Sequence, residues 1–215
     1  MRETQLPANK TSGLATEISR PSVEQLVATF AQKVSDPVAR AASLILRATG
    51  ENLYREGLLN TPKRFSKGIS HLFSGYEGTV EGVVGSGVFP AEGTGLVSVR
   101  DVEFYSLCEH HLLPFWGKAS VAYYPKQKIL GLSKIPRIID HFSKRVQVQE
   151  RITEQVADTI IKIIEARAVA VRVTACHLCM MMRGVQKQSS ETVTEALRNV
   201  ENLSQLERDR MMGAL

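Results

Sequence analysis

Cysteine is scarce in this sequence, and long apolar stretches are missing from it. Only three of the 215 residues are cysteine, an odd number that does not make a disulfide framework for a chain of this length. No apolar run approaches the ~20 residues that span a bilayer. The first 22 residues are polar and contain no apolar segment of a cleavable signal peptide. We therefore expect a cytoplasmic protein with no membrane partner.

Aromatic residues are also few, at 6% of the chain, while the formal net charge is +5. The lysines and arginines are scattered along the sequence, and no aromatic residues alternate with them as a nucleic-acid platform requires. We expect no nucleic-acid partner. The positive charge instead favours a small anionic ligand, such as a substrate that carries phosphate.

The hydrophobic content of 43% suits one substantial core. Residues 1–22 are rich in Thr, Ser, Asn and Pro without periodicity, which predicts a flexible N-terminal tail. We expect residues 23–215 to form a single domain, with a helical N-terminal part at 23–75 and a core at 96–197.

Apolar periodicity and capping residues predict helices at 23–34, 37–49 and 61–75. Asp36 and Pro37 open the second of these and Gly50 closes it. The pattern then predicts strands at 96–107 and 116–124, helices at 133–145 and 149–167, strands at 169–179 and 184–197, and a last helix at 203–212. This order indicates an α+β fold with an antiparallel four-stranded sheet and two helices inserted between the strand pairs.

The stretch "SLCEHHLLPFWG" at 106–117 gathers rare residues between two predicted strands. Cys108 and His111 are three residues apart in a turn, a spacing at which a thiolate and an imidazole can reach one metal ion. His110 lies between them and cannot easily do the same. We predict Cys108 and His111 as metal ligands and His110 as their neighbour.

A second group, Cys176, His177 and Cys179, lies at the end of a predicted strand. Side chains alternate between the faces of a strand, so His177 and Cys179 are expected on one face and Cys176 on the other. If the two segments meet, Cys108, His111 and Cys179 form a site with three protein ligands and an open fourth position. That arrangement is typical of catalytic zinc.

Two other interpretations of the cysteines and histidines fit the sequence less well. A structural zinc site would need a fourth protein ligand. A zinc nucleobase deaminase is a poor match, because its signature has His or Cys two residues before the catalytic Glu and a downstream P-C-x-x-C. Here Glu109 directly follows Cys108, and no proline precedes Cys176.

The sequence resembles the GTP cyclohydrolase I family from about Val38 to Thr194. The resemblance depends on five stretches in order: "TPKRFSKG" at 61–68, "SLCEHHLLPFWGK" at 106–118, "GLSKIPRI" at 131–138, "QVQERIT" at 147–153 and "HLCMMMRGVQK" at 177–187. It implies a tunnelling fold and an enzyme that converts GTP into 7,8-dihydroneopterin triphosphate and formate, at the head of pterin and folate synthesis. It also implies a homodecamer with active sites at subunit interfaces.

The resemblance also implies roles for individual residues. Zn²⁺ is bound at the positions of Cys108, His111 and Cys179, and protons are transferred at those of His110 and His177. Gln149 and Glu150 fall at base-recognition positions, where a carboxylate can accept the paired N–H groups of guanine. The positions implied for the triphosphate are Ser133, Lys134, Arg137 and Arg183, with Arg64 and Lys67 from a neighbouring subunit.

The chain departs from the family pattern at Thr174, Ala175 and Cys176, and in the segment "EALRNVENLSQLERD" after Thr194. Two alternative functions therefore stay open. One is a zinc-bearing pseudoenzyme that binds a nucleotide or a partner protein without turnover. The other is a related tunnelling-fold enzyme that acts on another purine or pterin. The retained His110 and His177 favour an enzyme, because a binding module has no need of proton-transfer groups.

Overall fold

The computed structural model describes residues 35–215, which form two compact units that meet in sequence at Lys67 and Gly68. The predicted tail at 1–22 and the predicted helix at 23–34 lie outside the described residues. Among the described residues, no helix has the length and apolar character needed to cross a membrane. The prediction of a single domain over 23–215 stays a prediction.

The first unit contains α2 (Pro37–Ala48), the 3-10 turn η1 (Glu56–Leu58) and the start of α3 (Thr61–Leu72). The Asp36 carboxylate caps α2 by accepting from the backbone N–H groups of Val38 and Ala39, both at 3.0 Å. Gly50 follows α2 with a φ of 80°, a left-handed conformation that glycine adopts without steric cost. The predicted caps of this helix are therefore confirmed.

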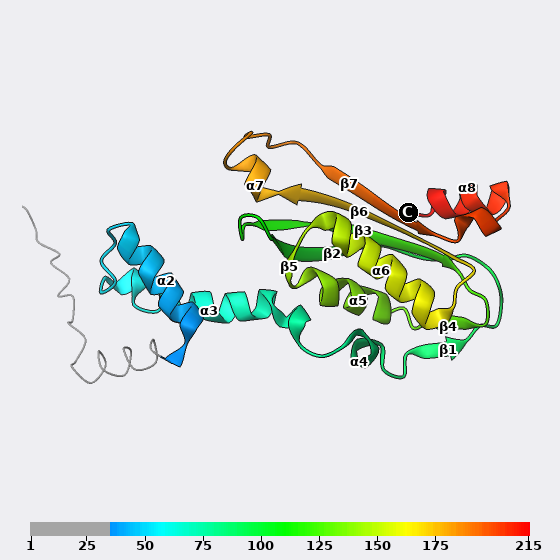
Figure 1. The fold of residues 1–215 in the computed structure, drawn as a ribbon, viewed down its shortest axis with the longest axis horizontal. Helices are drawn as coiled ribbons and strands as arrows, with labels where there is room; N and C mark the ends of the chain where they lie inside the picture. Colours follow the sequence, from blue (N-terminus) through cyan, green and yellow to red (C-terminus); the bar gives the residue numbers. More distant parts are fainter. Residues whose placement is uncertain (1–34) are drawn as a thin grey trace, which may run out of the picture. The chain divides into compact units, whose positions relative to one another are not determined.

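The second unit contains most of the secondary structure (Figure 1). After α3, its elements are η2 (Ser74–Tyr76), α4 (Val80–Val84), β1 (Val88–Pro90), β2 (Val97–Cys108), β3 (Pro114–Tyr124), β4 (Lys128–Leu130), α5 (Lys134–Ser143), β5 (Val146–Gln147), α6 (Gln149–Ile164), β6 (Ala168–His177), α7 (Leu178–Met181), β7 (Thr192–Arg198), η3 (Val200–Asn202) and α8 (Gln205–Gly213).

The main sheet has the strand order β5-β2-β3-β6-β7. The four long strands β2, β3, β6 and β7 pair antiparallel, and α5 and α6 are inserted in the chain between β3 and β6. This confirms the predicted α+β class. The sequence analysis missed the short strand β5, which pairs parallel to the end of β2, and the two-stranded sheet of β1 and β4. Strands of two or three residues are too short to show a period.

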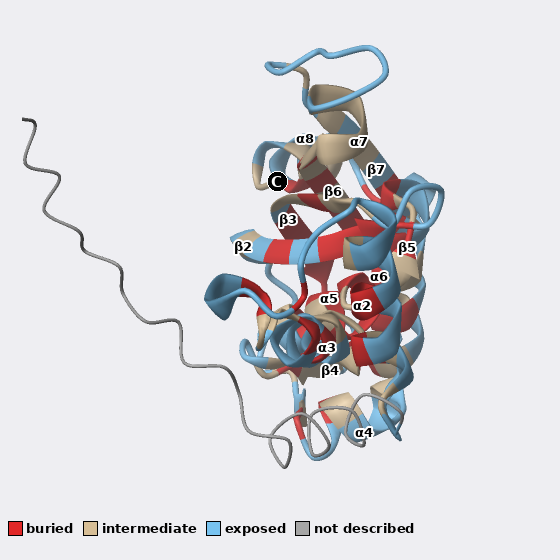
Figure 2. Ribbon diagram, turned by 90° about the vertical axis from the view of Figure 1, so that its left-hand side faces the viewer, coloured by how far each residue is buried: buried red, intermediate tan, exposed pale blue. Residues whose placement is uncertain are grey.

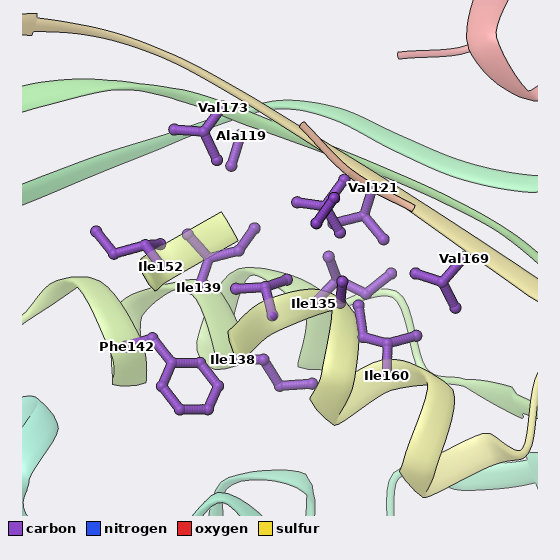
Figure 3. Packing of buried hydrophobic residues seen from close by; sticks show 14 of the residues in the cluster. Ala119, Val121, Ile135, Ile138, Ile139, Phe142, Ile152, Ile160, Val169 and Val173 are labelled. Atoms are coloured by element: carbon purple, nitrogen blue, oxygen red, sulfur yellow. The ribbon is translucent and has the colours of Figure 1, made fainter. Parts of the chain in front are cut away.

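Side chains alternate between the two faces of the main sheet, and each face is covered by a cluster of buried residues. On one face, Val169, Val171 and Val173 of β6 join the core that α5 and α6 cover. Figure 3 shows Ile135, Ile139 and Ile160 of these helices packed toward Val121 and Val169. Ala168 and Ala170 belong to a smaller cluster on the other face, together with Tyr124, Leu203 and Met211. Figure 2 shows buried residues in β3 and β6 and also in the helices α5 and α6.

Several predicted boundaries were wrong. Strand β6 ends at His177, not Cys179, because the chain turns into α7 there. Strand β7 begins at Thr192, not Gly184, since Gly184 and Gln186 have left-handed φ angles of 64° and 52° that a strand does not contain. Helix α6 ends at Ile164, where Glu165 adopts a left-handed conformation. Smaller shifts shorten α3 and α5.

Gly117 makes the β3–β6 pairing possible, because a Cβ atom at this position would lie 1.9 Å from the Thr174 carbonyl oxygen. We expect Gly117→Ala to force the two backbones apart. Overpacking of this kind typically costs about 1–3 kcal/mol, which lowers Tm by about 2–12 °C for a chain of this size. Thermal unfolding measures the change. The control is Gly93→Ala, where an added Cβ meets no atom within 4 Å. Equal Tm values for the two variants would contradict this role of Gly117.

Candidate functional site

The first segment of the site is the turn that joins β2 to β3. Cys108 is the last residue of β2, and its backbone N–H donates to the Leu113 carbonyl at 2.9 Å. Its own carbonyl accepts from the N–H groups of His111 at 3.3 Å and Leu112 at 2.8 Å. Leu112 has a left-handed φ of 54°. These bonds close a tight turn, so that Cys108 and His111 lie near one another.

The second segment lies at the end of β6. Antiparallel pairing of β3 with β6 places His177 opposite Phe115, immediately after the turn of the first segment. The chain then enters α7, which carries Cys179. The two segments, far apart in the sequence, therefore meet at one end of the sheet.

Together the two segments build a group of possible metal ligands. One ligand atom from each of Cys108, His111 and Cys179 lies within 4.8 Å of the other two. Two sulfur atoms and one imidazole are a donor set that suits zinc among the divalent metals. The residues present therefore fit a metal ion, as the sequence predicted.

Cys179 joins the group as predicted, but the prediction that strand alternation would orient its side chain was wrong. Cys179 reaches the group from the helical turn α7 and not from strand alternation. Cys176, which stays on the strand, does not belong to the group. It lines a cavity of about 240 Å³ together with Tyr105, Trp116 and Glu191.

His110 lies beside the group without being part of it. Its Nδ1 is 3.8 Å from the Cys108 sulfur, about as close as the His111 Nδ1 at 3.9 Å, but only His111 also lies near Cys179. The two histidine rings are 6.2 Å apart, with an interplanar angle of 68°. The His110 side chain is 66% exposed, so it is accessible to a ligand.

His177 is held on two sides. Its ring stacks on Phe115, with centroids 4.6 Å apart and an interplanar angle of 5°. Its Nε2 lies 2.8 Å from the Gln149 side-chain oxygen. Burial lowers the pKa of the His177 imidazole below its ordinary value, and the Glu150 carboxylate offsets part of this effect. Burial also raises the pKa of the Cys179 thiol, as does the neighbouring Cys108.

The amide of Gln149 is occupied inside the protein. The residue is 1% exposed, and its Nε2 donates to the Val173 carbonyl at 3.0 Å and the Thr192 carbonyl at 2.9 Å, and lies 3.2 Å from the Thr194 hydroxyl. Backbone carbonyls only accept, so this nitrogen cannot be exchanged with the oxygen. The sequence analysis could not foresee these partners, which lie on β6 and β7. Glu150, the next residue, is exposed.

The predicted phosphate-binding residues lie in several places. Arg183 follows α7, and its charge acts on the Cys179 thiol. Ser133 and Lys134 stand at the start of α5, which follows β4 at the end of the sheet away from α7 (Figure 1). Lys134 Nζ donates to the Val83 carbonyl at 3.4 Å. Arg137 lies one turn further along α5. Arg64 and Lys67 belong to α3 in the first unit, and their role stays a prediction.

Sequence reasoning also missed an ion pair beside the metal group. The Glu109 carboxylate, which lies between Cys108 and His110 in the chain, is bound by the guanidinium group of Arg151 on α6 at 2.6 Å and 3.3 Å. Both residues belong to the quoted stretches at 106–118 and 147–153. The family resemblance therefore included both residues, but nothing in their sequence spacing predicts that the two side chains meet.

Comparison with known proteins identifies the family. The profile of the GTP cyclohydrolase I family matches residues 38–215. GTP cyclohydrolase 1 of Deinococcus radiodurans is 52% identical over 170 residues, which are 79% of this chain and 79% of that protein. GTP cyclohydrolase 1 of Leptospira biflexa is 53% identical over 153 residues, covering 71% of this chain and 84% of that protein. GTP cyclohydrolase 1 1 of Pseudomonas syringae is 54% identical, covering 71% and 82%. The chain therefore belongs to the GTP cyclohydrolase I family of enzymes.

Proposed function

We propose that this protein is a zinc-dependent GTP cyclohydrolase I. The reaction opens the imidazole ring of the guanine in GTP by hydrolysis, releases formate and rearranges the remainder to 7,8-dihydroneopterin triphosphate. The observation that carries the proposal is the convergence of Cys108, His111 and Cys179 within 4.8 Å, with His110 and His177 beside them. Membership of the family and the names of its relatives support the substrate.

Cys108, His111 and Cys179 are the residues that would hold the metal. When zinc is bound there, it supplies a water nucleophile at neutral pH by lowering the pKa of the water to about 7. Three protein ligands leave one coordination position for this purpose, whereas structural sites usually have four. Cys108 is buried and Cys179 half-buried, so the sulfur atoms face little competing solvent, while the exposed His111 lies on the side open to a substrate.

His110 and His177 move protons. Opening a purine ring requires a proton on the ring nitrogen that leaves, and an imidazole titrates in the right range. The Gln149 oxygen can only accept, so His177 Nε2 carries a hydrogen and donates it to Gln149. Nδ1 is then the nitrogen of His177 that exchanges a proton with the substrate. Stacking on Phe115 keeps this nitrogen in place.

Glu150 recognises the base. Its carboxylate accepts two hydrogen bonds, which matches the N–H groups on the Watson–Crick edge of guanine, whereas adenine presents an acceptor there. Gln149 was predicted to share this task. Because its amide is already bonded to the protein, Gln149 serves instead to orient His177.

The triphosphate is bound by cations from more than one copy of the chain. Within one chain, the start of α5 is separated from the metal group by the length of that helix, which for ten residues is about 15 Å. Ser133, Lys134 and Arg137 therefore serve the metal group of a neighbouring copy, while Arg183 serves its own. This supports the homo-oligomer, a decamer by family resemblance, with active sites between subunits. We place the protein in the cytoplasm.

The first prediction tests the function itself. Purified, zinc-loaded protein incubated with GTP is expected to release formate and to give a pterin fluorophore after oxidation. ATP is expected to react up to ~10⁴-fold more slowly, because the Glu150 carboxylate is then left without its hydrogen-bond donors. Formate release from both nucleotides, measured as kcat/KM, checks this. Absence of both products favours the pseudoenzyme, and comparable turnover of ATP contradicts the role of Glu150.

The second prediction separates the two adjacent histidines. His111→Ala removes one of three protein ligands, so both the zinc content and the activity are expected to fall. His110→Ala is expected to keep its zinc but to lose the ~10²- to 10⁴-fold that general acid–base catalysis contributes. Zinc per subunit and formate release are measured on each variant. If His110→Ala loses the metal and His111→Ala keeps it, the two roles are exchanged.

The third prediction concerns Gln149. Gln149→Met removes the acceptor that orients His177, and a misplaced catalytic group typically costs about 100-fold in rate. We expect kcat to fall by that amount while KM for GTP and the zinc content change little. Gln205→Met is the control, since the Gln205 side chain donates to Asp209 on the exposed side of α8. A raised KM with an unchanged kcat would instead assign Gln149 to base recognition.

A further inference from the structure

The ion pair between Glu109 and Arg151 connects the metal-binding turn to helix α6. Arg151 NH1 lies 2.6 Å from Glu109 Oε2, and NH2 lies 3.3 Å from Oε1. Each of the two guanidinium nitrogens therefore contacts one carboxylate oxygen, a bidentate geometry that fixes direction as well as distance. Glu109 lies between Cys108 and His110 in the chain, so holding its side chain restrains the turn on both sides.

Gln147 anchors the same turn from a buried position. The residue is 2% exposed, and its Nε2 donates to the Phe142 carbonyl at 3.0 Å and to Gln155 Oε1 at 2.8 Å. Its own Oε1 therefore faces Arg151, whose NH1 donates to it at 3.2 Å. The Gln147 carbonyl accepts from the backbone N–H of Glu109 at 2.9 Å. Arg151 is thus held by a fixed side chain while it holds Glu109.

The Glu109 carboxylate also faces His110. Its Oε1, which also accepts from Arg151 NH2 at 3.3 Å, lies 3.9 Å from His110 Nε2. A carboxylate released from Arg151 is free to turn onto this imidazole. The ion pair therefore keeps two things in place, namely the turn that carries Cys108 and His111 and the open side of His110.

We propose that Arg151 is a positioning residue, which holds Glu109 so that the turn presents Cys108 and His111 to the metal and leaves His110 free for the substrate. This inference rests on the proposed function, since it assigns the metal and the proton transfer to these residues. Arg151 touches neither the metal group nor the reacting atoms. It acts through Glu109.

Because the ion pair is exposed, its effect on metal binding can be distinguished from an effect on the stability of the fold. The side chains of Arg151 and Glu109 are 45% and 33% exposed, and ion pairs of such exposure contribute little to the free energy of unfolding. A loss of the pair is therefore expected to leave Tm almost unchanged. Groups that orient metal ligands, in contrast, typically change metal affinity or activity by 10- to 100-fold.

The test compares Arg151→Met with a matched control. Arg172→Met removes an ion pair of similar exposure, between Arg172 Nε and Glu195 at 2.6 Å, with side chains 33% and 37% exposed, together with the bond from Arg172 to the Leu215 carbonyl at 3.2 Å. The ion pair joins β6 to β7 away from the metal group. We expect Arg151→Met to lose zinc to a chelator about 10-fold faster than the unchanged protein, and Arg172→Met to lose it at the original rate. The visible spectrum of the cobalt(II)-substituted proteins is expected to change in Arg151→Met alone.

Two further variants sharpen the result. Arg151→Lys keeps the charge and is expected to restore part of the zinc retention, but not all, because an ammonium group cannot bind both oxygens in a fixed geometry. Adding Glu109→Gln to Arg151→Met is expected to have less effect than the two single changes summed, since both break the same contact. In GTP turnover, Arg151→Met is expected to lower kcat with KM little changed.

The proposal is overturned if Arg151→Met and Arg172→Met lose zinc at the same rate, or if the faster zinc loss of Arg151→Met is accompanied by a large fall in Tm that Arg172→Met does not show. Additive effects of Glu109→Gln and Arg151→Met also overturn it. If the unchanged protein binds zinc but does not turn over GTP, the proposed function fails, yet the zinc-loss rates and cobalt spectra still decide the role of Arg151.

Discussion

The antiparallel pairing of β3 with β6 is the constraint on which the site depends. It runs from Tyr124 opposite Ala168 to Phe115 opposite His177, so its last pair lies where one strand leaves the metal-binding turn and the other enters α7. A slip of one residue would turn every side chain of β6 to the opposite face. The valines of β6 would then leave the core that α5 and α6 cover. Burial of that core therefore fixes the register, and the register fixes the distance between Cys108 and Cys179.

The same core sets the chemistry of the second histidine. Gln149 begins α6, and packing of α6 on the sheet carries its amide to the carbonyls of Val173 and Thr192. A buried amide without partners is costly, so these bonds are as obligatory as the packing itself. They leave one oxygen, which faces His177. Packing of the apolar core therefore fixes the position of the Gln149 amide, and the Gln149 oxygen in turn fixes the orientation of the His177 imidazole.

Much of this fold could be predicted from the sequence, because long elements have a clear period or a strong cap. The helix opened by Asp36 has the cap, and the long amphipathic helix from Gln149 has the period. The local changes of backbone structure near the site could not be predicted from the sequence. The strand ends at His177 and a helical turn carries Cys179, although the residues themselves continue an apolar run. Strand β5 has only two residues, yet it brings Gln147 beside the metal-binding turn. Ligand identity was readable from residue type and spacing, whereas the contacts that orient the ligands arise from tertiary packing.

The course of α5 bears on whether one chain can supply the whole of the proposed site. Its C-terminal end leads into β5, which pairs with the last residues of β2 next to the metal group. Its N-terminal end, with Ser133 and Lys134, is therefore directed away from that group. Ten helical residues span about 15 Å. Either a nucleotide held near Cys108 extends along α5 to these cations, or a second copy presents its α5 to this metal group. In the second possibility, one copy supplies the metal group and the other supplies the cations at the start of α5. Activity would then require assembly of the two copies.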